Sequence, residues 1–277
     1  QKIRFNTPVA SGEANGCYGL TEANAGSDPA GMKTTAVLDG DSWIINGEKK
    51  FITNGNIAKY AVIAAVTDKT KGYKGITQFV LDLENTEGFS VGKVEEKLGI
   101  RGSGTSELVF QDARIPKDSI LGDPGSGFKQ MLTTLDSGRI GIASQALGIA
   151  KAALEESVNY SKERVQFGKP ISSFQATQFK LADMATRIDA SELLILKAAW
   201  LETNHLPFER EAAQAKMFAS DTAMDATIEA VQILGGYGYS SEYPVERLMR
   251  DAKITQIYEG TNEIMRVVIS RNVLGMR

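Results

Sequence analysis

Two patterns of apolar and polar positions divide the chain. From about residue 10 to residue 120, short apolar runs rich in β-branched and aromatic residues alternate with clusters of Gly, Asn and Asp. Such runs, separated by turn-forming residues, are typical of β-strands. Their roughly even spacing favours an antiparallel sandwich or barrel over βαβ units. The predicted strands are 17–21, 33–38, 42–46, 60–66, 76–83, 89–97 and 107–111.

Glycine-containing segments between these runs are predicted to be turns and loops. Asn46-Gly47 is typical of a tight turn and is expected to end the third strand. The glycine-rich segment Gly99–Gly104 lies between strands and is expected to be a loop. No Gly-x-Gly-x-x-Gly follows a strand and opens a helix, so the sequence lacks the dinucleotide-binding fingerprint of Rossmann folds.

Helical periodicity begins at about residue 126. Leu147, Ala150, Leu154 and Val158 recur at steps of three and four, which predicts one helix face. Ser172-x-x-Gln175 matches a capping box and predicts the start of the next helix. In that helix the expected core positions are Phe174, Leu181, Met184, Ile188 and Ile195.

A third helix is predicted over 211–234, ending at Gly235-Gly236. Its expected inward face is Met217, Met224, Ile228 and Val231, and its alanine-rich remainder allows close helix contact. Thr261 and Asn262 are good N-caps for a last helix that ends at Gly275.

These elements predict the fold class and the domain limits. With four or five helices, the second half is long enough for an antiparallel bundle. The chain is therefore expected to be an α+β multidomain protein, an antiparallel β-sandwich or barrel followed by an antiparallel helical bundle. The predicted domains are 1–123, a middle β domain with a short N-terminal remnant, and 124–277, a C-terminal helical bundle.

Composition excludes several classes of function. With 277 residues, 42% hydrophobic and 23% charged, the chain is typical of soluble globular proteins, and a net charge of −3 gives no reason to expect nucleic acid. One cysteine, Cys17, excludes an internal disulfide. One histidine, His205, excludes Ser-His-Asp catalysis and multi-His metal sites; its surroundings predict an exposed turn. No apolar run is long enough to span a membrane, and no metal site is expected.

Glu259 is the candidate catalytic residue. It precedes Gly260 and the N-caps of the last helix, so it reads as a carboxylate on a loop. On spacing alone, the default interpretation is a first-turn acid that complements the helix dipole.

Five segments in this order resemble the acyl-CoA dehydrogenase family. Tyr18–Asp28 resembles the flavin-contacting signature, with Ala23 where proline is usual. Lys50–Gly55 resembles the second flavin segment, with Phe51 where tryptophan is common. Arg164–Pro170 resembles the segment that reaches the FAD of a neighbouring subunit, and Gln232–Gly238 resembles a glycine turn near the cofactor. Glu259-Gly260-Thr261 resembles the catalytic loop. The likeness covers the whole chain without the family's N-terminal helical domain, and is closest to the short-chain, butyryl-CoA type.

The resemblance implies a reaction and its residues. Glu259 is the base that removes the α-proton of an acyl-CoA while flavin N5 accepts the β-hydride, giving a trans-2-enoyl-CoA. The implied FAD contacts are Tyr18, Leu20, Thr21, Gly26, Ser27, Phe51, Ile52, Thr53, Arg164, Phe167, Gln175, Gln232, Leu234, Gly235, Gly236, Thr261, Asn262 and Glu263. The implied substrate contacts are Ser27, Asp136, Arg139, Tyr258 and Gly260.

Elementary chemistry agrees with these roles. No side chain accepts hydride, so the reaction needs a cofactor. Glu259 needs a dry pocket that raises its pKa, and burial must outweigh the nearby helix N-terminus. In some relatives, the isovaleryl type among them, the base stands at the place of Gly138. A glycine there leaves Glu259 as the candidate, and Arg139 is expected to position its loop.

Alternatives and partners remain open at this point. An enoyl-CoA reductase uses the same residues in reverse, an acyl-CoA oxidase passes its electrons to oxygen, and a non-catalytic helical scaffold belongs to another class. The resemblance implies electron-transfer flavoprotein as partner and a homotetramer, a dimer of dimers. A bacterial cytoplasm is favoured, with the mitochondrial matrix left open.

Overall fold

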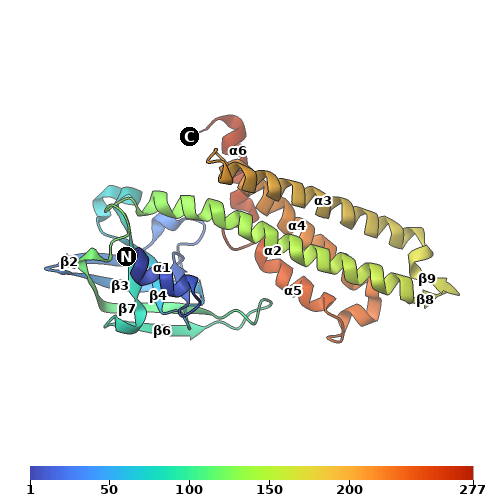
Figure 1. Ribbon diagram of the computed structural model, residues 1–277, viewed down its shortest axis with the longest axis horizontal. Helices are drawn as coiled ribbons and strands as arrows, with labels where there is room; N and C mark the ends of the chain where they lie inside the picture. The colour runs from blue at the N-terminus through green and yellow to red at the C-terminus, as the bar shows by residue number, and fades with distance from the viewer. Residues whose placement is uncertain (277) are drawn as a thin grey trace. The chain divides into compact units, whose positions relative to one another are not determined.

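The computed structural model describes residues 1–276. Figure 1 shows its helices and strands in chain order. The chain forms two compact units. The first comprises residues 1–97 and 101–132, and the second comprises residues 98–100 and the chain from residue 133 onward. Each unit is described by itself. The domain boundary at residues 123 and 124 stays a prediction.

The first unit is built on a seven-stranded sheet. A helix that the sequence did not predict, α1 (Lys2–Ala10), precedes it, and Phe5 of α1 meets Tyr60 edge to face at 5.1 Å. The strands are β1 (Gly16–Gly19), β2 (Thr35–Asp39), β3 (Ser42–Thr53), β4 (Tyr60–Val66), β5 (Ile76–Asp82), β6 (Phe89–Val94) and β7 (Thr105–Pro116). All seven predicted strands are present, and Gly99–Gly104 lies in the loop between β6 and β7.

The sheet order is β1-β4-β2-β3-β7-β6, with β5 paired to β4. Most pairings are antiparallel, but β1 runs parallel to β4 from Gly16↔Tyr60 to Gly19↔Ile63. The two strands between β1 and β4 in the sequence, β2 and β3, pair with each other as an antiparallel hairpin. Side chains of β3, β4, β5 and β7 form the core, with Ile45, Ile63, Phe79 and Leu108 fully buried.

The predicted turn at Asn46-Gly47 is wrong. The strand continues to Thr53, and Asn46-Gly47 lies at a register shift between β3 and β7. A bulge, which inserts one extra residue into a strand, accounts for both the turn-like residues and the unbroken pairing. Gly47 has a φ of 145°, and a Cβ there would lie 2.5 Å from Thr34 Oγ1. A second shift follows between Lys49 and Ile52.

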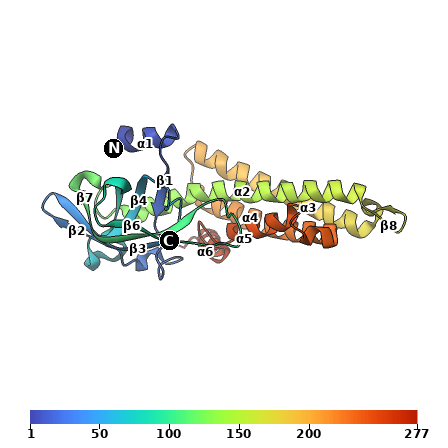
Figure 2. The ribbon, with the colours of Figure 1, turned by 90° about the horizontal axis from the view of Figure 1, so that it is seen from below.

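The second unit is helical. Its elements are most of α2 (Gly127–Glu163), then α3 (Gln175–Thr203), α4 (Glu209–Leu234), α5 (Val245–Thr255) and α6 (Asn262–Leu274), with a small hairpin of β8 (Val165–Gln166) and β9 (Lys169–Pro170). Helices α2, α3 and α4 lie alongside one another and share one core (Figure 2). The 3-10 turns of the chain are Pro29–Gly31, Lys69–Gly75, Leu83–Asn85, Lys117–Ser119, Ile171–Ser173 and Gly235–Tyr239. The prediction of a β domain followed by a helical bundle is confirmed.

Two helix predictions need correction. Ser172 does not cap α3, because a 3-10 turn covers residues 171–173 and Phe174 is the N-cap. The apolar stripe of α4 does not face inward as a whole, since Ile228 is 47% exposed. The alanines face inward instead, and Ala212, Ala215, Ala219 and Ala223 are fully buried. Small side chains let α4 approach α3 and α2 closely, so close packing outweighs the burial of larger residues.

The predicted helix ends are confirmed elsewhere. Thr261 caps α6, its hydroxyl accepting from the Ile264 N–H, and Gly275 ends α6 with a left-handed backbone. Gly235 ends α4, and His205 lies in an exposed turn. Among residues 1–276, every helix is too short or too polar to cross a membrane.

The bulge at Gly47 generates a stability prediction. Gly47→Ala is expected to destabilise the β unit by about 2 kcal/mol, because the new methyl group meets Thr34 and the backbone conformation disfavours any L-residue. The measurement is urea unfolding followed by Trp43 fluorescence in a Trp200→Phe background. The control is Gly102→Ala, where a Cβ meets nothing within 4 Å. Equal midpoints for the two variants would contradict the bulge.

Candidate functional site

The loop between α5 and α6 presents Glu259 in an unfavourable backbone conformation. Glu259 has a φ of 55° and Gly260 a φ of 94°, so two consecutive residues lie in the left-handed region. The φ of Gly260 disfavours any residue with a side chain, and a Cβ there would also lie 2.7 Å from Cε of the flexible Met265 side chain. A non-glycine residue with positive φ costs free energy and persists only where its surroundings fix it.

Helix α4 fixes this loop through buried polar side chains. Lys216 Nζ donates to the Gly260 carbonyl at 2.7 Å and to Asn262 Oδ1 at 3.0 Å. Asn262 Nδ2 donates to Asp221 Oδ1 at 2.7 Å and to Ser220 Oγ at 2.9 Å. The Asn262 N–H closes the loop by donating to the Gln256 carbonyl at 3.0 Å. The loop is therefore held from one helix at several points.

The Glu259 carboxyl lies against α2. A Cβ built at Gly138 would lie 2.7 Å from Glu259 Oε2, so the missing side chain of Gly138 makes room for the carboxyl. Burial raises the pKa of Glu259, and the positive charges of Arg139 and Lys216 oppose the rise without cancelling it. The condition set from the sequence, that burial must dominate, is met.

Arg139 and Asp136 form a buried pair one turn apart on α2. Arg139 Nη1 donates to Asp136 Oδ1 at 2.5 Å, and Arg139 is only 4% exposed. Burial raises the pKa of Asp136 to about 6, against the charge of Arg139. The buried Arg139 Nε has no hydrogen-bond partner among residues 1–276. Tyr258, beside Glu259, donates from its hydroxyl to Gln145 Oε1 at 2.5 Å.

In the β unit, a buried ion pair braces the first predicted flavin segment. Lys49 is fully buried; its Nζ lies 2.8 Å from Glu22 Oε1 and donates to the Leu20 carbonyl at 3.1 Å. Glu22 also accepts from the N–H groups of Lys33 and Thr34. Burial opposes ionisation of Glu22, but Lys49 and these donors outweigh it and lower the pKa of Glu22. The segment that carries Leu20 and Thr21 is thereby fixed to β3.

The end of β3 presents a strained aromatic residue and an exposed hydroxyl. Phe51 has a φ of 58° within the second register shift, and its ring is 62% exposed. Thr53 ends the strand and is exposed. A bulky residue with positive φ is rare, and here it lies in the irregular pairing between Lys49 and Ile52. Both residues belong to the second predicted flavin segment.

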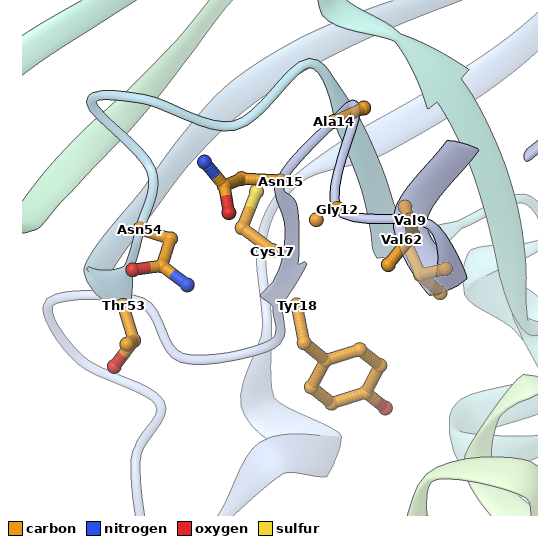
Figure 3. A pocket seen from close by; sticks show the side chains of 10 residues that line it. Val9, Gly12, Ala14, Asn15, Cys17, Tyr18, Thr53, Asn54 and Val62 are labelled. Atoms are coloured by element: carbon orange, nitrogen blue, oxygen red, sulfur yellow. The ribbon is translucent and has the colours of Figure 1, made fainter. Parts of the chain in front are cut away.

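A hollow of about 570 Å³ lies where β1 starts and β3 ends. Figure 3 shows Asn15 and Cys17 near each other, with Asn54 and Thr53 together on one side and Tyr18 farther along the same strand as Cys17. Burial raises the pKa of the Cys17 thiol to about 12, so Cys17 stays protonated and is no nucleophile. The hollow thus brings together Tyr18 from the first predicted flavin segment of this unit and Thr53 and Asn54 from the second.

In the helical unit, two other predicted segments meet. The Arg164 guanidinium lies over the Tyr237 ring at 5.5 Å, which joins the β8–β9 hairpin to the turn after Gly235-Gly236. Phe167, at the hairpin tip, has a φ of 53° and is 93% exposed. Gln175 and Gln232 are exposed. The two segments therefore form one exposed surface.

The remaining predicted site residues differ in exposure. Gly26, Ser27, Gly236 and Glu263 are exposed, while Ile52, Leu234 and Asn262 are buried.

Sequence reasoning missed Glu22, Lys49, Lys216 and Asp221. A lysine on the alanine face of α4 was a usable signal for Lys216. Lys49 lies in the charged run Glu48-Lys49-Lys50, which gives no sign that one of its members is buried. The bulge at Gly47 decides on which face of the sheet the Lys49 side chain lies.

Comparisons with known proteins identify relatives over almost the whole chain. The family "Acyl-CoA dehydrogenase, middle domain" matches residues 17–113, and "Acyl-CoA dehydrogenase, C-terminal domain" matches residues 125–274. A relative from Clostridium acetobutylicum, "Acyl-CoA dehydrogenase, short-chain specific", is 52% identical over 273 residues, covering 99% of this chain and 72% of the relative.

Solved structures agree. Butyryl-CoA dehydrogenase from Megasphaera elsdenii is 54% identical with a TM-score of 0.97, covering 99% of this chain and 71% of that one. A chain in a structure described as the electron transferring flavoprotein of Acidaminococcus fermentans is also 54% identical with a TM-score of 0.97, covering 99% and 72%.

The buried pair in the β unit generates a second prediction. Lys49→Met leaves Glu22 buried without its cation and is expected to cost about 3 kcal/mol of stability. The double variant Lys49→Met/Glu22→Gln is expected to recover part of that loss, because a neutral amide still accepts from Lys33 and Thr34. The measurement is the Trp43 unfolding experiment described above. The control is Lys50→Met, which breaks only the part-exposed pair with Glu107 and is expected to cost at most about 1 kcal/mol. A similar loss for Lys49→Met and Lys50→Met would contradict the bracing role.

Proposed function

This chain belongs to the acyl-CoA dehydrogenase family of oxidoreductases, and we propose that it dehydrogenates a short-chain acyl-CoA to a trans-2-enoyl-CoA. The observation that carries the proposal is the Glu259 carboxyl, buried beside a glycine with its pKa raised. The short-chain preference rests on the relatives reported above, which match this chain from end to end.

Glu259 is the proposed base for the substrate α-proton. An ordinary carboxylate is too weak for this task, and burial raises its basicity toward a useful strength. Arg139 and Lys216 limit the rise, so that the group still ionises and can accept a proton. The left-handed backbone of the loop directs the side chain to the space above Gly138.

Removal of an α-proton also requires stabilisation of the thioester oxygen as it gains negative charge. Among residues 1–276, no acceptor takes the backbone N–H of Glu259 in a hydrogen bond. This N–H is the proposed donor to the thioester carbonyl. Base and donor then belong to one residue, which fixes their relative geometry. Asp136, Arg139, Tyr258 and Gly260 are proposed to line the acyl-CoA site.

FAD is the proposed cofactor, and when bound it accepts the β-hydride. The β unit fits it: the exposed Phe51 ring suits one face of a planar ring system, and Tyr18, Thr21 and Thr53 offer hydroxyl groups. Gly26 has open space around its Cα, which suits close approach of a phosphate at Ser27. The backbones of Leu20 and Ile52 are proposed to complete these contacts.

The exposed surface of the helical unit is proposed to serve the FAD of a neighbouring subunit. Arg164 supplies a cation for the pyrophosphate and Phe167 an apolar ring. Gln175, Gln232 and the turn at Gly235-Gly236 contribute polar groups, and Leu234 lies behind them. Thr261, Asn262 and Glu263, at the start of α6, are proposed FAD contacts too. This arrangement requires an oligomer, and a homotetramer is proposed.

Electron-transfer flavoprotein is the proposed electron acceptor. Its support is the family of the chain and the likeness to a chain in a structure described as an electron transferring flavoprotein. Bleaching of the flavin by butyryl-CoA without oxygen, followed by recovery when that flavoprotein is added, is the expected behaviour. Peroxide formation in air would assign an oxidase. Oxidation of the reduced flavin by an enoyl-CoA, in a protein that butyryl-CoA does not bleach, would assign the reverse reaction.

Glu259→Gln tests the base. The variant is expected to keep bound FAD and to lose about 10³-fold or more in the rate of bleaching by butyryl-CoA. The wild-type rate is expected to fall as the pH drops through the pKa of Glu259, above the ordinary value of 4.5, because the protonated carboxyl accepts no proton. Stopped-flow absorbance measures both. Glu192→Gln, which removes only an exposed partner of Lys151, is the control. Retained turnover in Glu259→Gln would reject Glu259 as the base.

A further inference from the structure

Lys216 is the one fully buried lysine of the described helical unit, and it stands on the alanine face of α4. Its neighbours Ala213, Ala215 and Ala219 are also fully buried. Removing an ammonium group from water costs several kcal/mol, so a buried lysine is tolerated only where specific acceptors compensate it. Both of its hydrogen-bond acceptors, the Gly260 carbonyl and Asn262 Oδ1, belong to the segment around Glu259.

These two hydrogen bonds hold the part of the loop in which consecutive residues have the unfavourable left-handed backbone conformation. The Gly260 carbonyl belongs to the second of the two left-handed residues. A donor at 2.7 Å holds the peptide plane between Gly260 and Thr261, one residue after Glu259, and so restrains the loop backbone next to Glu259. Asn262 is tied in turn to Ser220 and Asp221, so one turn of α4 holds both ends of the Gly260–Asn262 segment.

We propose that Lys216 is a positioning residue for Glu259, which holds the loop through Gly260 and Asn262 and places a buried positive charge near the carboxylate. The inference rests on the proposed role of Glu259 and adds a second requirement to it. The base must be buried to be strong, yet a cation must stay close enough for the carboxylate form to exist.

The charges around Lys216 come from every element packed against it. Asp221 lies on α4, Glu259 on the loop, Glu263 on α6 and Arg139 on α2. Burial and, to a smaller extent, the charge of Arg139 lower the pKa of Lys216, the three carboxylates oppose the fall, and the resulting pKa is about 8. Lys216 therefore keeps its charge through neutral pH, where Glu259 acts. Lys216 in turn lowers the pKa of Glu259.

Lys216→Met separates positioning from general stability. Methionine keeps much of the apolar stem and removes both the charge and the donor. At saturating butyryl-CoA and neutral pH, where Lys216 is charged in the wild type, the full-length flavin-loaded variant is expected to bleach about tenfold or more slowly, because Glu259 is no longer held in place. Its acid limb is expected to move up by about one pH unit, because the nearby positive charge is gone. A merely structural lysine would lower stability and leave the limb in place.

A conservative variant and a matched control complete the design. Lys216→Arg keeps the charge with a different geometry, so its rate is expected to fall while its acid limb stays near that of the wild type. Lys151→Met removes an exposed lysine paired with Glu192, and both readouts are expected to stay unchanged. Infrared difference spectra against Glu259→Gln measure the titration of the Glu259 carboxyl directly, without turnover.

Each outcome decides the matter. A wild-type protein that butyryl-CoA does not bleach would reject the proposed function. A bleaching wild type with an unmoved acid limb and an unchanged carboxyl titration in Lys216→Met would overturn the role of Lys216 alone. Failure of both Lys216→Met and Lys216→Arg to fold would overturn it too, because Lys216 would then be required for the fold and not for the base.

Discussion

The helical unit depends on a conflict between burial and charge at the α5–α6 loop. A carboxylate that is taken out of water becomes a stronger base but also resists ionisation. Two cations approach the Glu259 carboxyl from different helices, Arg139 from α2 and Lys216 from α4. Each cation is itself almost or fully buried, and each needs its own acceptors. The polar groups at the core of this unit are therefore coupled, and none can be exchanged without consequence for the others.

The β unit solves a related problem with a simpler pair. Lys49 and Glu22 are buried together, and the Glu22 carboxylate also accepts hydrogen bonds from the backbone N–H groups of Lys33 and Thr34. The result is a rigid connection between β3 and the first part of the Tyr18–Asp28 segment, around Leu20 and Glu22. Phe51 and Thr53 lie on the same strand as Lys49, a few residues farther along. A cofactor bound there would meet two segments whose spacing is already fixed, which reduces the entropy lost on binding.

Local signals in the sequence predicted the elements well. The seven strands, the Thr261 cap, and the glycines that end α4 and α6 depend on neighbouring residues, so short-range reasoning is enough. Glu259 could be identified because its loop resembles that of a known family, whereas periodicity alone left it an ordinary helix-start acid.

Predictions failed where tertiary packing decides the outcome. Asn46-Gly47 has the composition of a turn, yet the pairing of β3 with β7 makes it a bulge. Ile228 fits an inward stripe, yet close approach of the helices favours the alanine face. Lys216 and Lys49 are buried because partners distant in sequence accept their hydrogen bonds, and no local pattern contains that information.

The absence of a side chain at Gly138 limits how such a site can evolve. Glu259 Oε2 occupies the space that a side chain at position 138 would enter. With Glu259 in its proposed role as the base, a lineage that acquired a carboxylate at 138 first would bring two negative charges into one dry pocket, while a lineage that lost Glu259 first would have no base. Neither single step keeps a working site, so transfer of the base between these two positions requires paired substitutions. The location of the base is thus an inherited property of a lineage that is hard to reverse by gradual change.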